Sequence, residues 1–428
     1  MNKHIRFIDL FAGMGGTRKG FEIACCKKGY TSECVFTSEI KPYAVEVLKQ
    51  NYPNEEVYGD ITKIQAKQIP DFDFLLGGFP CQAFSSAGKR LGFEDTRGTL
   101  FFEVERILKE KRPYGFVLEN VEGLVTHDKK NPKDKIGKTL KTILVHLETL
   151  GYKVSWRVLN AKFFGVPQER KRIYIVGTLQ EKPDISHFEQ TSSVLGDILE
   201  KGLETEYSEF INKLLTHYSI KELAGKSIKD KRGGDNNIHS WDIEIKGSVS
   251  EEQRELLNMM LKERRKKKWA EEYGIDWMDG MPLTINQIRT FFDYPELEKM
   301  LKDLVDKEYL RYEHPKKKVD GHRVPDTSLP KGYNIVAGKL SFEISKIMSD
   351  NDIAPTLVAM DMHRLYVTDS GGLRNLSLKE GLRLFGYPDN YKLNIEKRLG
   401  YDLLGNTVVV PVITEVSARV LDIYCKEV

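Results

Sequence analysis

Short apolar runs alternate with longer amphipathic stretches over residues 1–180. Residues 5–10 (IRFIDL), 71–78 (DFDFLLGG) and 115–120 (GFVLEN) are short and rich in β-branched and aromatic side chains, a composition that predicts buried strands. Between the last two runs, residues 100–111 repeat apolar positions at the spacing of a helix. This order of strands and helices predicts an α/β fold with a mostly parallel sheet that helices cover on both faces.

The pattern changes twice along the chain. Periodicity weakens over residues 181–373, where charged segments such as 262–269 (KERRKKKW) accumulate, and it returns over residues 374–428. We therefore expect residues 1–180 to begin a main domain, 181–373 to form a smaller one, and 374–428 to pack back on the main domain. Within the smaller domain, residues 283–318 indicate either a winged-helix-like unit or a plain helical insertion.

Composition narrows the class of protein. The chain has 428 residues, of which 40% are hydrophobic and 30% charged, as in soluble globular proteins. We see no apolar run near the roughly 18 residues that a membrane span needs, so we expect a cytoplasmic protein with no membrane partner. Five cysteines without metal-ligand spacing indicate free thiols and no metal site. Because the 66 basic residues are nearly balanced by 63 acidic ones, a nucleic-acid partner would have to bind a local basic patch.

Polar residues follow the first predicted strands, where parallel sheets bind ligands. The glycines of residues 11–16 (FAGMGG) could let backbone amides approach a ligand, although a tight turn would explain them as well. A further predicted strand, residues 34–40 (CVFTSEI), ends in Glu39, which could accept hydrogen bonds from ribose hydroxyls. Asp60 is placed to reach a base. Either acid could instead be solvated in a loop or cap a helix.

A thiol and a carboxyl follow two further strands. Cys81 lies in residues 77–85 (GGFPCQAFS), where glycine and proline make a bend that would present the thiol, although free cysteines are usually buried and inert. Glu119 ends the next strand, so the pair would suit addition of a nucleophile to an electron-poor ring. Arg170 and Arg172 of QERKR could serve a phosphate or a carbonyl oxygen, or could be surface charges.

Six motifs, taken in order, resemble those of the DNA cytosine-5 methyltransferases of bacterial restriction-modification systems. The resemblance covers roughly the first 180 and last 60 residues, so chance agreement is very improbable. It implies a Rossmann-like domain and an enzyme that transfers a methyl group from S-adenosyl-L-methionine to carbon 5 of a flipped-out cytosine. The poorly matched residues 181–373 correspond to the family's target-recognition domain. The motifs are DLFAGMGG (9–16), GGFPCQAFS (77–85), LENVEGL (118–124), GVPQERKRIYIVG (165–177), RNLSLKEGLRLFGYP (374–388) and GNTVVVPV (405–412).

The resemblance also implies roles for individual residues. Cys81 would be the nucleophile, while Glu119, Arg170 and Arg172 would hold the target cytosine. The cofactor contacts would be Phe11, Gly13, Gly15, Glu39, Asp60, Ile61, Pro80, Leu100, Asn406 and Val408. The DNA contacts would be Gln82, Ser85, Ser86, Arg97, Gln168, Thr356 and Leu357. Several relatives place a tryptophan after the ribose-binding acid, where Ile40 offers only apolar contact.

The partners implied are double-stranded DNA and a cognate restriction endonuclease acting on the same site, and we expect a monomer. Methylation of RNA by the same cysteine chemistry and a non-catalytic DNA-binding role are alternatives. The long basic middle region favours duplex DNA, and the intact Cys81, Glu119 and Arg172 favour catalysis. The basic clusters at residues 264–268 and 316–318 would contact phosphates, or would be solvated surface charge.

Overall fold

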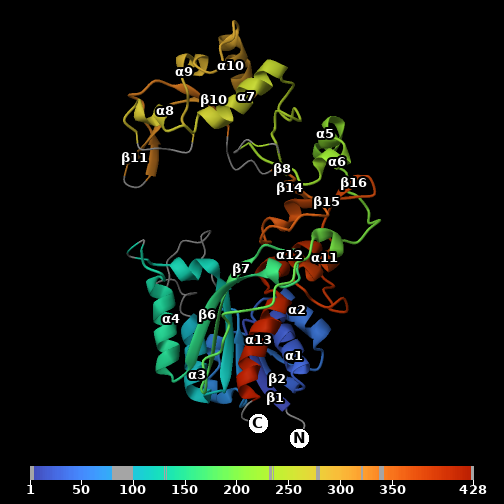
Figure 1. Ribbon diagram of the computed structural model, residues 1–428. Helices are drawn as coiled ribbons and strands as arrows, with labels where there is room; N and C mark the ends of the chain where they lie inside the picture. Colours follow the sequence, from blue (N-terminus) through green and yellow to red (C-terminus); the bar gives the residue numbers. More distant parts are fainter. Residues whose placement is uncertain are drawn as a thin grey trace. The chain divides into compact units, whose positions relative to one another are not determined.

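The computed structural model describes residues 4–79, 100–129, 131, 133–230, 234, 236–275, 280–319, 322–336 and 342–425. The chain forms two compact units (Figure 1). The first comprises Met1–Glu200, Asp350–Met362 and Leu376–Val428, and the second comprises Lys201–Ser349 and His363–Asn375. Residues 181–200 and 350–362 thus fall in the first unit rather than in the predicted middle domain. They do so because Thr191 pairs with Phe164, and Ala354 with Gln168, through backbone bridges.

A seven-stranded sheet organises the first unit. The strand order is β3-β2-β1-β4-β5-β7-β6. The first five strands run parallel, whereas β7 is antiparallel to both β5 and β6. The predicted α/β fold with a mostly parallel sheet is therefore confirmed. The strands are β1 (His4–Leu10), β2 (Thr31–Ser38), β3 (Val57–Tyr58), β4 (Phe74–Gly77), β5 (Gly115–Val121), β6 (Lys153–Asn160) and β7 (Lys171–Thr178).

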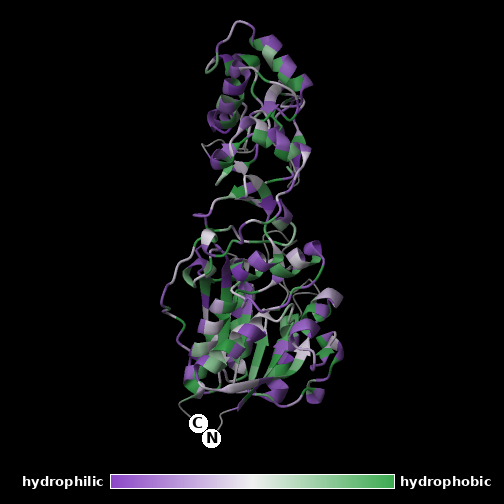
Figure 2. Cartoon of the chain, turned by 90° about the vertical axis from the view of Figure 1, so that its right-hand side faces the viewer, coloured by the Kyte–Doolittle hydropathy of each residue, from purple (hydrophilic) through white to green (hydrophobic). Residues whose placement is uncertain are grey.

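Helices cover both faces of this sheet. Figure 2 shows hydrophobic residues concentrated in the strands, whereas the helices mix hydrophilic and hydrophobic residues. Helices α1 and α13 pack together so closely that a Cβ on Gly20 would lie 2.6 Å from the Ile413 side chain. The C-terminal segment therefore belongs to the core of the first unit. The helices of this unit are α1 (Gly16–Lys27), α2 (Pro42–Asn51), α3 (Leu100–Lys111), α4 (Lys138–Thr149), α11 (Leu378–Leu384), α12 (Lys397–Asn406) and α13 (Val410–Tyr424).

One stretch of the described chain, Lys397–Tyr424, is long and apolar enough to cross a membrane by length and composition. It corresponds to α12 and α13, and 72% of its most apolar window is buried inside the fold. The expectation that no apolar run reaches that length was therefore wrong, and the reason is that these helices belong to a hydrophobic core.

The described residues of the second unit form two hydrophobic cores. One lies around a five-stranded sheet of order β16-β15-β14-β8-β9, and the other lies among helices α7–α10 and the pair β10-β13. The helices are α5 (Glu209–His217), α6 (Ile220–Leu223), α7 (Glu251–Glu263), α8 (Lys268–Glu271), α9 (Ile285–Arg289) and α10 (Leu297–Asp306). The strands are β8 (Ser227–Ile228), β9 (Asn237–Ile238), β10 (Leu310–Glu313), β11 (Lys316–Val319), β12 (His322–Pro325), β13 (Gly332–Ile335), β14 (Lys346–Met348), β15 (Leu365–Asp369) and β16 (Gly372–Asn375).

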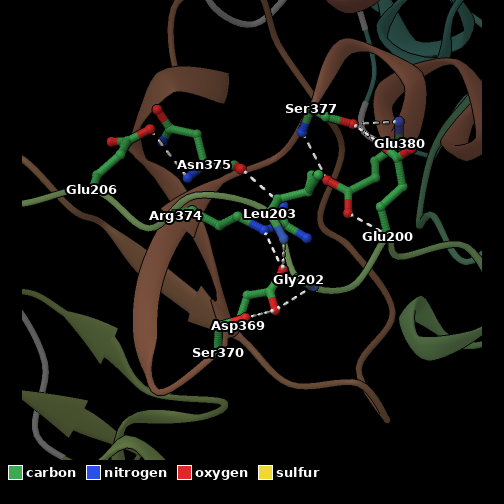
Figure 3. A network of polar contacts seen from close by, with 10 residues as sticks. All are labelled: Glu200, Gly202, Leu203, Glu206, Asp369, Ser370, Arg374, Asn375, Ser377 and Glu380. Atoms are coloured by element: carbon green, nitrogen blue, oxygen red, sulfur yellow. Dashed lines mark hydrogen bonds and ion pairs between the residues drawn. The ribbon is translucent and has the colours of Figure 1, made fainter.

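Polar networks hold the segments that enter and leave the second unit (Figure 3). Within that unit, the Asp369 carboxylate accepts hydrogen bonds from the amides of Gly202 (3.0 Å) and Leu203 (3.2 Å) and from Arg374 Nε (2.8 Å). Although burial alone would raise the pKa of Asp369, these donors hold it well below its usual range. Within the first unit, Glu380 accepts from the Glu200 amide (2.8 Å) and also caps α11.

Candidate active site

The ends of β4 and β5 bring two predicted catalytic segments side by side. Gly77 is in register with Leu118, and a Cβ on Gly78 would lie 3.6 Å from Glu119 Oε2. Asn120 Nδ2 donates to the Phe79 carbonyl (3.1 Å), which fixes the chain as it leaves β4. The chain that leads to Cys81 thus runs directly past the Glu119 carboxyl. The predicted site residues Pro80, Cys81, Gln82, Ser85, Ser86 and Arg97 themselves lie outside the described residues.

Glu119 is an acid held out of water. It is 9% exposed, and its Oε1 lies 3.2 Å from Arg172 Nε. Burial raises the pKa of the Glu119 carboxyl, an effect that Arg172 and Arg170 oppose in part. The carboxyl therefore keeps its proton at a higher pH than an ordinary glutamate, as a proton donor requires.

Arg170 binds main-chain carbonyls that come from two distant parts of the sequence. Its guanidinium donates to the carbonyls of Leu357 (2.9 Å), Gly405 (3.2 Å) and Thr407 (2.8 Å). Its central carbon also lies 5.2 Å from the ring centre of Phe385. These bonds join the segment before β7 to residues 357 and 405–407. They indicate that Arg170 positions the site, and they do not support the predicted contact with the base.

Two predicted DNA contacts are buried, so the structure does not support them. Gln168 is fully buried, and its Nε2 donates to the Leu384 carbonyl (3.1 Å). The Leu357 side chain is also fully buried. Thr356, by contrast, is exposed, and its Oγ1 donates to the Glu169 carbonyl (2.6 Å). Sequence alone could not predict the burial of Gln168 and Leu357, because it depends on residues far along the chain.

The glycine-rich segment after β1 bends through left-handed backbone. Phe11, Gly13 and Gly15 have φ values of 56°, 54° and 76°, of which the first is unusual for a residue with a side chain. A Cβ on Gly13 would meet no atom within 4 Å, so that side of the loop is open. A Cβ on Gly16 would instead lie 2.8 Å from Thr407 Oγ1. Gly13 thus faces space for a ligand, while Gly16 is required for packing.

Glu39 lies beside this open glycine. Its Oε2 accepts from the Gly13 amide (2.7 Å), and its Oε1 accepts from the amides of Ile40 and Lys41, both at 2.8 Å. A carboxylate oxygen can accept two hydrogen bonds, so Oε2 keeps capacity for a ligand hydroxyl. Ile40 is 70% exposed, which places an apolar surface next to the acid. An open backbone, an acceptor and an apolar surface together fit a nucleoside.

The other predicted cofactor contacts differ in their surroundings. Asp60 Oδ1 accepts from the amide (3.0 Å) and the hydroxyl (2.7 Å) of Thr62, and these bonds lower its pKa. Asp60 therefore caps the short 3₁₀ helix Ile61–Lys63, which was the alternative interpretation of this acid. Ile61 and Val408 are buried, Leu100 is partly buried, and Asn406 is exposed.

A buried acid at the end of β1 did not feature in the sequence-based prediction. Asp9 is fully buried, and neither carboxyl oxygen has a hydrogen-bond partner among the described residues. Burial raises the pKa of Asp9 to about 8, although the nearby Arg18 guanidinium opposes the shift. Arg18 itself stacks 3.3 Å from the Tyr52 ring centre and bonds to Glu22 at 2.7 Å. The signal in the sequence was a single acid inside the apolar run IRFIDL.

A family model for C-5 cytosine-specific DNA methylases matches residues 5–422. The chain belongs to this family. The methyltransferase is 67% identical to Type II methyltransferase M.NlaIV of Neisseria lactamica, over 98% of the chain and 99% of that protein. It is 66% identical to Type II methyltransferase M.NgoBV of Neisseria gonorrhoeae, over the same shares. Among solved structures it is similar to the S. pombe Dnmt2 methyltransferase, with a TM-score of 0.56 and 15% identity, over 98% of the chain and 99% of that structure.

These comparisons confirm the DNA cytosine-5 methyltransferase activity that the motif order predicts. The family match spans both compact units, including the middle region that the motifs leave uncovered. Membership in the family also implies the use of S-adenosylmethionine. The likeness to the S. pombe structure, at low identity, supports the fold alone.

Proposed function

We propose that the enzyme methylates carbon 5 of a cytosine flipped out of a specific duplex DNA site, and so protects DNA from a cognate restriction endonuclease. One observation carries the catalytic part. Glu119, a buried acid whose pKa is raised by desolvation, lies beside the segment that leads to Cys81. The protective role rests on close relatives that are named Type II methyltransferases. We propose that the enzyme acts as a monomer.

Carbon 5 of cytosine is a weak nucleophile, so the protein must first push electrons into the ring. Bonding of the Cys81 sulfur to carbon 6 would do so, with Glu119 donating its proton to ring nitrogen N3. A free thiol has a pKa of about 8.5, so the site must favour the thiolate during attack. Arg172, 3.2 Å from Glu119, would orient that carboxyl and polarise the ring carbonyl. Once carbon 5 carries the methyl group, loss of the carbon-5 proton, departure of the Cys81 thiolate and return of the N3 proton to Glu119 would restore the aromatic ring.

S-adenosyl-L-methionine would supply an electrophilic methyl group at this site. Glu39 would accept a hydrogen bond from the ribose, and Ile40 would contact the adenine through apolar surface. Gly13 leaves the backbone side of the site open. Phe11, Gly15 and the residues around Asn406 would form the remaining walls of the cofactor site.

The test is transfer of a labelled methyl group to duplex DNA and, in parallel, to RNA. We expect label in DNA at cytosine carbon 5, at one sequence that bisulfite mapping would identify. Label in RNA alone would support the alternative substrate, and label in neither would overturn the proposal.

Cys81→Ser provides the matched control. A hydroxyl is a far weaker nucleophile than a thiolate at neutral pH, so we expect no measurable transfer while cofactor affinity stays close to wild type. Duplex DNA with 5-fluorocytosine at the mapped position should trap wild-type enzyme as a covalent complex through Cys81. Turnover near the wild-type rate by the serine variant, or absence of the trapped complex, would refute the covalent mechanism.

A further inference from the structure

Residues 251–335 of the second unit have the topology of a winged helix. Helix α7 is followed by the four-residue helix α8 and an extended segment at Leu283, then by α9, α10, β10, the hairpin β11–β12 and β13. Leu283 pairs antiparallel with Tyr333 of β13, through backbone bonds of 2.9 and 2.7 Å, and β13 pairs antiparallel with β10. Strands β10 and β13 therefore flank the hairpin β11–β12, which occupies the position of a wing. This favours the first of the two interpretations of residues 283–318.

The wing, Lys316–Pro325, does not serve the hydrophobic core of this unit. The core draws on helices α7–α10 and on strand residues such as Leu310 and Ile335, and on no described residue of the wing. Seven of the eight residues assigned to β11 and β12 are exposed, and Lys316 is half-buried. The base is nevertheless fixed, because the Asp326 amide donates to the Pro315 carbonyl (2.7 Å). The wing is thus an exposed hairpin whose ends are held together by a backbone hydrogen bond next to its base.

The pairing of β11 with β12 determines which basic residues of the wing share a face of the hairpin. Lys316 is opposite Pro325, and Lys318 is opposite Arg323. Because alternate residues and cross-strand partners share a face of a hairpin, Lys316, Lys318 and Arg323 lie on one face. We call this set the cationic face. Like charges placed directly opposite destabilise a hairpin, so the Lys318–Arg323 pair has a cost that an anionic partner would remove.

Nothing described within the protein supplies that partner. Among the described residues no carboxylate forms an ion pair with Lys316, Lys318 or Arg323, while Lys317 on the opposite face pairs with Asp326 at 3.3 Å. Helix α10, by contrast, exposes both acidic and basic side chains, and its Lys299 forms an ion pair with Glu296 at 3.2 Å. The basic cluster 264–268 is not equivalent either, because Arg264 is buried against Asn334 (2.8 Å). The expectation that this whole cluster contacts phosphates was therefore wrong for Arg264.

We infer that the cationic face of the wing binds the phosphodiester backbone of the duplex, as a sequence-independent contact separate from the methylated cytosine. Three side chains on one strip of a hairpin suit successive phosphates, and such contacts set register and affinity without reading bases. The inference rests on the proposed function, since it takes duplex DNA as the substrate. The inference assigns this phosphate contact to the wing. It does not assign it to α10, which corresponds to the helix that reads bases in most winged-helix units.

The test compares two double variants of the full chain, Lys318→Gln with Arg323→Gln on the wing and Lys299→Gln with Lys302→Gln on α10. Both remove two positive charges from exposed positions. Binding to labelled duplex DNA is measured by fluorescence anisotropy over a range of salt concentrations, and KM and kcat are measured on the mapped site. A thermal melt checks that each variant is folded, and single substitutions replace any double variant that is not.

We expect the wing variant to bind all duplexes more weakly, with a salt dependence shallower by about 2 in slope, roughly 0.9 for each lost phosphate contact. KM should rise while kcat and the methylated sequence stay unchanged, and the α10 variant should match wild type. An unchanged slope for the wing variant would overturn the inference. Because binding is measured without methyl transfer, a wild-type enzyme that methylates no DNA would refute the proposed function by itself.

Discussion

A carboxyl group can donate a proton near neutral pH only if its surroundings keep the proton on it. At Glu119 the surroundings are the buried end of β5, where desolvation outweighs two nearby guanidinium groups. The sequence could place this acid at the end of a strand, because the apolar run before it is clear. It could not predict the balance between burial and Arg172, because that balance depends on distances across the sheet.

Replacing Glu119 by glutamine keeps the shape of the side chain but removes the acidic proton. We expect the single-turnover rate of methyl transfer to fall roughly 10²- to 10⁴-fold, the range typical of a lost general acid, while DNA affinity changes little. Glu122→Gln, an exposed acid on the same segment, is the control and should behave as wild type. Equal rates for the two variants would reassign Glu119 to a structural role.

Asp9 gives a prediction about stability. Its pKa is about 8 in the folded protein and about 3.9 in an unfolded chain, so between these values the folded state holds a proton that the unfolded state has released. The stability linked to this proton is complete below about pH 4 and is lost as pH rises through about 8. Relative to Asp9→Asn, the wild-type free energy of unfolding should therefore fall as pH increases over this range. Urea titrations at several pH values, with Asp306→Asn as an exposed control, would detect it. If the free energy of unfolding depended on pH in the same way for wild type and Asp9→Asn, the raised pKa of Asp9 would be contradicted.

At the scale of elements, local patterns and long-range contacts differ in how well sequence predicts them. Strands β1, β4 and β5 stand out as apolar runs because both faces of a parallel sheet are buried. Helix α13 was predictable from its periodicity. The bonds from Arg170 to the carbonyls of Leu357, Gly405 and Thr407 were not, because they join segments about 190 to 240 residues apart, for which the sequence has no local signal. The buried Gln168 was misjudged for the same reason.

At the scale of the molecule, the second unit interrupts the first, and the structure supplies boundaries for exchanging it. Replacing Lys201–Ser349 and residues 363–375 of a related enzyme with those of this chain should transfer the methylated sequence, because the first unit needs to hold only the cofactor and one flipped base. Sequencing of bisulfite-treated DNA from cells that express the hybrid would report it. An active hybrid that keeps its original specificity would locate recognition in the segment that contains Cys81 or in residues 350–362.

The packing of α13 on α1 also has a consequence for synthesis. Helix α1 ends at Lys27 and α13 begins at Val410, so the ribosome releases α13 long after α1. At about 5–20 residues per second, the nascent chain would leave the apolar side of α1 uncovered for tens of seconds before its partner emerges. A truncated product would lack that cover permanently. Methyl transfer to DNA therefore requires chains whose translation has passed through α13.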